Sequence, residues 1–166
     1  MLPLMPIPHA RRMNLIAQAL LITALLFFVG FHLGDWVRVT LELEPLKGWE
    51  LWKNAISVVR HSHLHGLPNS LLITMSALIV ASVLICGSPF AVKPLAASRA
   101  LWWGATVVSV ASFAGFGGFM AYYMVVEAVD EPGTGFFCLI AAQMLHFTGL
   151  LFIRREVPAA PEVDPA

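Results

Sequence analysis

Long apolar runs alternate along the chain with short polar connections. Four of these runs are long enough to cross the hydrocarbon core of a bilayer as helices, for which about 20 predominantly apolar residues suffice. They cover residues of about 15–33, 64–86, 100–126 and 134–153. The pattern therefore predicts an all-α integral membrane protein, a bundle of four transmembrane helices in a single domain over residues 1–153.

Local signals mark the ends of these runs. Residues 1–10 contain three prolines and are expected to be irregular, and Asn14 is a candidate N-cap for the first helix. The fourth run stops at Arg154, and the tail 154–166, rich in Pro, Ala and acidic residues, is expected to be disordered.

Residues 35–60 form the one extended polar segment, with four acidic and four basic residues. Within it, apolar side chains recur at helical spacing: Trp49, Trp52, Ile56 and Val59. This predicts an interfacial amphipathic helix over about 48–60 that leads toward the second span, with the tryptophans as anchors at the headgroup level.

Composition and charge support a membrane protein and give its orientation. The chain is 58% hydrophobic and 12% charged, whereas a soluble domain carries about 25% charged residues. It has no net charge and no basic run, so the lipid bilayer is an expected partner and nucleic acid is not. Four spans place both termini on one side, together with six basic residues: Arg11, Arg12, Lys93, Arg99, Arg154 and Arg155. The positive-inside rule makes that side cytoplasmic.

Three histidines, His61, His63 and His65, lie where the second apolar run begins. Polar groups at the mouth of a span are candidates for a functional site. His61 and His65 share a helix face at the spacing that chelates a metal. No carboxylate or further histidine lies near enough in the sequence to complete a zinc or di-iron set with these two. Alternatively one histidine is an axial ligand of haem, or all three reach toward water without a cofactor.

The residues after this cluster favour the haem interpretation. Gly66 leaves room beside the adjoining turn for a macrocycle, and Pro68 is expected to kink the helix because it cannot donate to the carbonyl of Leu64. Asn69 lies about 9 Å deeper than His63 at the rise of an α-helix. A buried asparagine beside the histidines also needs a function.

Other polar residues are expected at related depths. Tyr122 and Tyr123 lie near the end of the third run and could complete a shallow pocket with His63 and Asn69. His146 lies about 18 Å into the fourth helix, nearer the middle of the membrane. Its pairing with Gln143 at i and i+3 favours an interhelical hydrogen bond over a second ligand.

The third run is rich in glycine, at Gly104, Gly115, Gly117 and Gly118. Small residues let membrane helices approach closely, which is the favoured explanation, and they also leave room for a flat cofactor. The cysteines, Cys86 and Cys138, are isolated in apolar runs and are expected to be inert.

Two short motifs resemble those of the styrene oxide isomerases. The first is a His-x-x-Gly-x-x-Asn pattern at the second span, formed here by His63, Gly66 and Asn69, with Gly48-Trp49 upstream. The second is Gly115-Phe116 followed by Tyr122 in the third span. The resemblance covers these motifs and the plan of four helices.

The resemblance implies a specific chemistry. Members of that family are trimers in the bacterial inner membrane that hold haem b between neighbouring subunits. His63 would be the axial ligand, with Gly66 and His65 beside the haem, and Asn69 and Tyr122 would line the pocket. Ferric iron would then act as a Lewis acid on a small apolar aryl epoxide such as styrene oxide, and a 1,2-hydride shift would give the aryl acetaldehyde.

Two other functions remain open from the sequence. A membrane b-type cytochrome would ligate haem through two histidines, such as His63 and His146, and would transfer electrons. A structural membrane subunit would hold no cofactor. Either histidine beside His63 could also replace it as the ligand.

Overall fold

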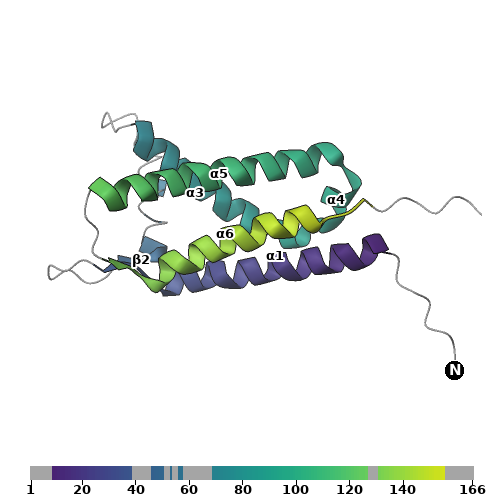
Figure 1. Ribbon diagram of the computed structural model, residues 1–166, viewed down its shortest axis with the longest axis horizontal. Helices are drawn as coiled ribbons and strands as arrows, with labels where there is room; N and C mark the ends of the chain where they lie inside the picture. The colour runs from purple at the N-terminus through teal and green to yellow at the C-terminus, as the bar shows by residue number, and fades with distance from the viewer. Residues whose placement is uncertain are drawn as a thin grey trace, which may run out of the picture.

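The computed structural model describes residues 9–38, 46–50, 53, 56–57, 69–126 and 131–155. Within these ranges the chain is mostly helical, and four long helices form an elongated bundle (Figure 1): α1 (His9–Leu33), α3 (Asn69–Gly87), α5 (Arg99–Val126) and α6 (Thr134–Phe152). A 3-10 turn, η1 (Ser88–Phe90), and a short helix, α4 (Val92–Ala97), connect α3 to α5.

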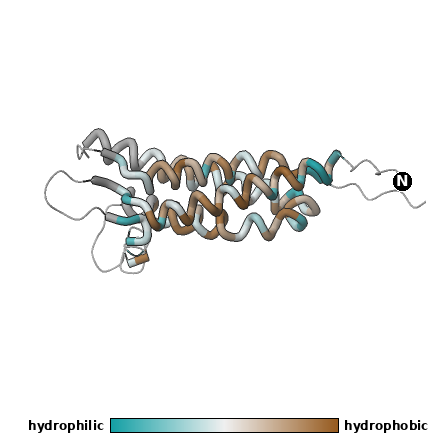
Figure 2. The backbone as a smooth tube through the Cα atoms, turned by 90° about the horizontal axis from the view of Figure 1, so that it is seen from below, coloured by the Kyte–Doolittle hydropathy of each residue, from teal (hydrophilic) through white to brown (hydrophobic). Residues whose placement is uncertain are grey.

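Three of these helices are long and apolar enough to cross a membrane: α1, α5 over Arg99–Gly118, and α6. In the second predicted span, the apolar helical stretch found among the described residues is the shorter Met75–Phe90. Figure 2 shows apolar residues along the bundle and hydrophilic residues gathered at its two ends. Large apolar side chains such as Leu26, Leu101 and Val107 are exposed, which suits contact with lipid.

The helices α1 and α6, which are distant in the sequence, pack against one another in antiparallel fashion along most of their length. Small residues make this possible, because Ala17 and Ala24 are fully buried. A Cβ added at Gly149 would lie 2.8 Å from the side chain of Leu21. Such contacts let two helix backbones approach closely.

The start of α1 differs from the prediction. The helix begins at His9 because no helix breaker follows Pro8, so the N-cap assignment of Asn14 is wrong. The Asn14 side chain instead joins α1 to the segment that follows α6. Its Nδ2 donates to the carbonyl oxygen of Arg154 at 2.9 Å, and its Oδ1 accepts from the backbone N–H of Arg154 at 2.7 Å.

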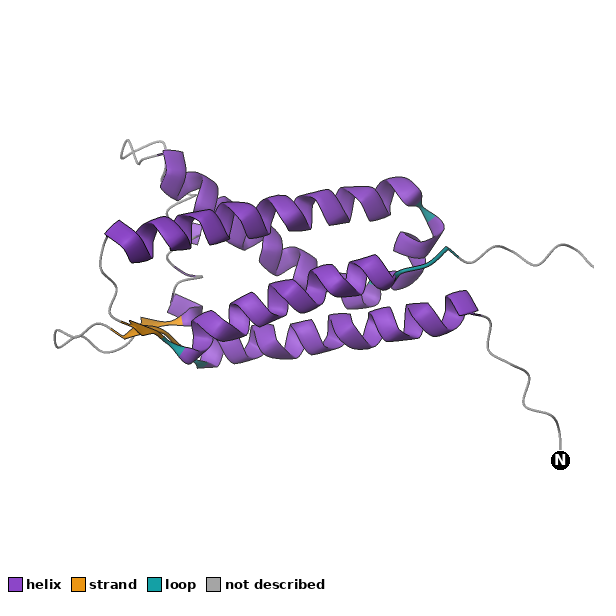
Figure 3. Ribbon diagram, in the orientation of Figure 1, coloured by secondary structure: helices purple, strands orange, loops and turns teal. Residues whose placement is uncertain are grey.

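A small antiparallel sheet, which the sequence did not predict, lies at the opposite end of the bundle (Figure 3). Its strand order is β2-β1-β3: β1 is Asp35–Arg38, β2 is Leu46–Lys47 and β3 is Glu131–Pro132. The sheet joins the segment after α1 to the segment before α6. Two glycines allow this, because a Cβ at Gly48 would overlap the Phe31 carbonyl and one at Gly133 would overlap the Asp35 carbonyl.

The predicted interfacial helix is partly described. Residues 48–50, 53 and 56–57 are helical, and the Lys47 N–H donates to Oε2 of Glu50 at 2.9 Å, as in one half of a capping box. Trp49 and Ile56 are exposed, as an interfacial face requires. Trp52 and Val59 lie outside the described residues.

The predicted bounds of the last two spans agree with α5 and α6 to within one residue. Helix α3 runs from 69 to 87, against a predicted span of 64–86 whose first residues are not described. Residues 153–155 are not helical, and the rest of the predicted disordered tail lies outside the described ranges.

Candidate functional site

The predicted site is described in part. His61, His63, His65 and Gly66 lie outside the described residues. Asn69 is the first residue of α3, and Tyr122 and Tyr123 lie in the last two turns of α5. For these three residues the structure describes the backbone.

The helices α3 and α5 bring Asn69 and Tyr122 to the same level. A Cβ at Gly115 would lie 3.5 Å from the Cβ of Ala77, which fixes the antiparallel register of the pair. Asn69 is eight residues before Ala77, and residue 123 is eight residues after Gly115, so both lie about 12 Å from this contact along the helix axes. The start of α3 and the end of α5 lie at the same end of the bundle (Figures 1 and 3).

An aromatic cluster lies in the core at this end. Trp36 of β1 is 5% exposed, and its ring centroid lies 5.5–5.7 Å from those of Phe31, Phe116 and Phe136. Phe116 is 1% exposed and lies six residues before Tyr122, which is about 9 Å along α5. The cluster therefore forms a buried apolar layer beneath the level of Asn69 and Tyr122.

The sequence reasoning missed this cluster except for Phe116, which belongs to the second motif. Phe28 and Phe31 recur at helical spacing in α1, which is a detectable signal. Trp36 had none, because it lies alone after Gly34 and is placed by strand pairing.

His32, near the end of α1, is held within its own helix. Its Nδ1 lies 2.8 Å from the Phe28 carbonyl oxygen, to which it donates because a carbonyl can only accept. The ring packs edge-on against Phe28 and Phe31, with centroids 4.6 and 4.9 Å away. His32 is thus held by the backbone and the aromatic side chains of its own helix.

His146 makes the interhelical hydrogen bond that the sequence favoured. Its Nδ1 lies 3.1 Å from Oγ of Ser109 on α5, and the residue is 2% exposed. Ser109 is thirteen residues before Tyr122, or about 20 Å along α5. His146 therefore does not share a site with Asn69 and Tyr122.

Polar atoms around His146 remain without partners in the described part of the chain. They are Nε2 of His146 and both amide atoms of Gln143, all of them buried. Elsewhere in the described ranges, no group of three or more His, Cys, Asp or Glu side chains gathers that could hold a metal ion.

The glycines of α5 have a different environment from the expected one. A Cβ at Gly104, Gly117 or Gly118 would meet nothing within 4 Å. The prediction that these glycines pack closely against another helix of the same chain is therefore wrong. The close approach occurs between α1 and α6 instead, at Gly149. The α5 glycines leave an uncovered surface at their own positions. Position 122 lies on the same helix face as Gly118, because the two are at i and i+4.

Comparison of the chain with protein-family models, with curated proteins and with solved structures gives no match. The resemblance to styrene oxide isomerases therefore rests on the motif residues of the sequence alone.

Proposed function

We propose that the chain is a membrane-bound, haem-dependent isomerase that converts an aryl epoxide such as styrene oxide to the aryl acetaldehyde. One observation carries this proposal: Asn69 begins α3, Tyr122 lies about one turn before the end of the adjacent antiparallel helix α5, and the two positions are at one level. Asn69 follows His63 by six residues. His146, the ligand that a cytochrome would need, lies about 20 Å away along the bundle.

In the proposed topology, the chain crosses the bacterial inner membrane four times, with α3 as the second span and both termini in the cytoplasm. The charges support this orientation. The end where α1 begins and α6 ends carries six basic residues, Arg11, Arg12, Lys93, Arg99, Arg154 and Arg155, whereas the described residues of the other end include three, Arg38, Lys47 and Lys53. Such an asymmetry is what the positive-inside rule relates to topology.

The residues at the site suit a haem held between the subunits of a homotrimer. His63 would ligate the iron, with His65 beside it and Gly66 leaving space for the ring edge. The open surface at Gly117 and Gly118 is a place where a flat apolar group or a neighbouring subunit can lie without displacing a side chain. When bound, haem would supply a Lewis-acidic iron with one open position to the epoxide oxygen.

The remaining chemistry falls to the residues of the chain. The benzylic C–O bond breaks, a hydride moves from the neighbouring carbon to the benzylic carbon, and the C=O bond forms, so no atom or electron is gained or lost. Tyr122 would donate a hydrogen bond to the substrate oxygen, and the Asn69 amide would orient the substrate. The buried apolar layer around Trp36 and Phe116 would help exclude water, which otherwise adds to the benzylic cation.

An absorption spectrum of the detergent-purified protein tests this proposal. The wild type should show a Soret band, His63→Ala should lose it, and His61→Ala, a matched change two residues away, should keep it. The haem-containing wild type should form phenylacetaldehyde from styrene oxide in air without a reductant.

The alternatives predict different results. A structural subunit would be colourless. A cytochrome would show a six-coordinate, reversibly reducible haem that is lost in His146→Ala, and it would not rearrange the epoxide.

A further inference from the structure

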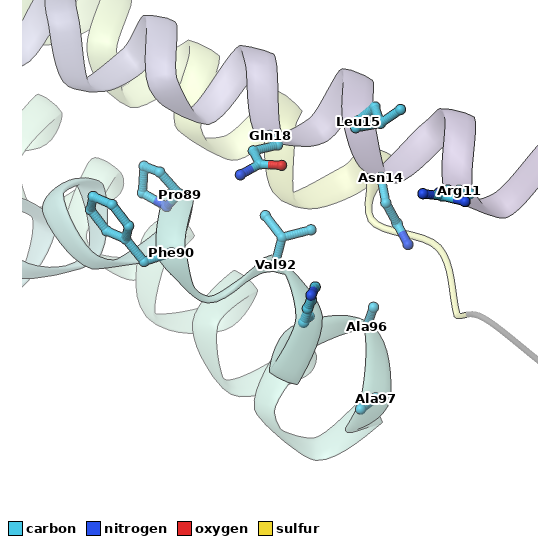
Figure 4. Close-up of a pocket in the computed structure, with 10 residues that line it drawn as sticks. Arg11, Asn14, Leu15, Gln18, Pro89, Phe90, Val92, Ala96 and Ala97 are labelled. Carbon is cyan, nitrogen blue, oxygen red and sulfur yellow. The ribbon is translucent and has the colours of Figure 1, made fainter.

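A groove of about 690 Å³ lies at the end of the bundle opposite to Asn69 and Tyr122. The first turns of α1 form one wall, and η1 with α4 forms the other (Figure 4). No step of the proposed reaction uses this groove.

The lining of the groove is both cationic and apolar. Arg11 from α1 and Lys93 from α4 contribute positive charge to opposite walls. Leu15 and Phe90 contribute apolar surface, and they are 54% and 82% exposed. Exposed Phe and Leu side chains of a helix can be buried at the boundary between headgroups and acyl chains.

The charges of the groove are not balanced by its own walls. Residues 9–18 and 88–97, which form the two walls, include no Asp or Glu. The nearby segments add the positive charges of Arg99, Arg154 and Arg155. The groove is therefore complementary to an anion.

We propose that the groove binds an anionic glycerophospholipid. Its phosphate lies between Arg11 and Lys93, and an acyl chain lies along Leu15 and Phe90. A lipid fits better than a free phosphate ion because the apolar side chains adjoin the cations and because α1 is long and apolar enough to span the bilayer. Basic pockets between membrane helices bind acidic headgroups in this way. The lipid would hold the connection between α3 and α5 against α1.

The test measures lipid binding by the full chain, purified in a neutral detergent and titrated with phosphatidylglycerol during native mass spectrometry. Arg11→Gln and Lys93→Gln should each weaken binding by about fivefold, and the double variant by about twentyfold. Arg12→Gln is the matched control, because Arg12 is exposed on the same helix turn but does not line the groove. Its affinity should equal that of the wild type.

Three further arms identify the ligand. Phosphatidylcholine should bind at least about fivefold more weakly than phosphatidylglycerol, inorganic phosphate should not compete at equal concentration, and Phe90→Ala should weaken lipid binding. Equal binding of the two lipids, or an equal loss in Arg12→Gln and Arg11→Gln, would overturn the proposal. Competition by inorganic phosphate at equal concentration would make the groove a site for a free anion and would overturn the lipid assignment.

Discussion

The two antiparallel helix pairs of the bundle are built differently. In the α1–α6 pair, Ala17, Ala24 and Gly149 lie at a close helix contact, and Asn14 joins the two helix ends through the backbone of Arg154. In the α3–α5 pair the described glycines of α5 meet open space, apart from the contact of Gly115 with Ala77.

This difference suggests a division of roles between the pairs. The tight pair makes its close contacts within the chain and is suited to act as a scaffold. The open pair carries the residues proposed for the reaction, Asn69 at the start of α3 and Tyr122 near the end of α5, and it presents small residues to whatever lies beside it. Space for a ligand or a second subunit is thus found on the pair that carries the proposed chemistry.

The largest expected effect is on the open pair, at Tyr122. Tyr122→Phe should lower kcat/KM for the rearrangement of styrene oxide by about 100-fold, because removal of one donor to a developing oxyanion costs about two to three orders of magnitude in rate. Tyr123→Phe is the matched control, since position 123 is about 100° around the helix from position 122, which shares the face of Gly115 and Gly118. The initial rate of phenylacetaldehyde formation is measured at equal haem content.

A larger loss in Tyr123→Phe than in Tyr122→Phe would transfer the donor role to Tyr123. Equal and small losses of kcat/KM in both variants would show that neither tyrosine takes part in the reaction. The proposed catalytic role of the α3–α5 pair would then lose its support.

The second effect concerns the tight pair. Gly149→Ala should lower the free energy of unfolding by about 2 kcal/mol, because the new Cβ overpacks the core against Leu21. Gly104→Ala, the same change in open space on α5, should leave stability unchanged or raise it by up to about 1 kcal/mol through helix propensity. Both are measured by unfolding in mixed micelles with increasing SDS.

If the two variants lose the same stability, the proposed contrast in packing is wrong. A loss of stability in Gly104→Ala alone, together with a smaller trimer fraction, would show that a neighbouring subunit packs against α5 at Gly104. That contact would then be tighter than the one between α1 and α6.

The contrast between the pairs also shows what the sequence could predict. The bounds of α5 and α6 follow from hydropathy, because the length of an apolar run is a local property that the membrane selects. Which helix packs closely on which is not local, so the glycines of α5 were assigned to a packing role that Gly149 fulfils.

The small sheet was beyond prediction for a similar reason. Strands of two to four residues carry no detectable periodicity, and β1 pairs with β3 across more than ninety residues. Helix depth alone predicted a shared level for Asn69 and Tyr122, and the structure describes their backbones at one end of the bundle (Figure 1). The pocket that they would form with His63 stays a prediction.

A smaller effect on stability is expected where Asn14 connects α1 to the segment after α6. Asn14→Ala removes two hydrogen bonds to the backbone of Arg154 and should cost about 1–2 kcal/mol of the free energy of unfolding. Gln18→Ala, an exposed position one turn later on α1, should change stability by less than about 0.5 kcal/mol. An equal effect of the two changes would mean that these bonds do not stabilise the tight pair.

The smallest effect tests one of the hydrogen bonds between the two pairs, which joins Ser109 of α5 to His146 of α6. Ser109→Ala should cost about 0.6 kcal/mol, the average for an interhelical hydrogen bond in a membrane protein. Thr148→Ala is the control, because that hydroxyl bonds within its own helix to the Met144 carbonyl at 2.8 Å. Since His146 lies about 20 Å from the level of Tyr122, neither variant should shift the Soret band of the haem-containing protein. A shift in Ser109→Ala alone would instead make His146 part of the haem site and would join the two pairs in function as well as in packing.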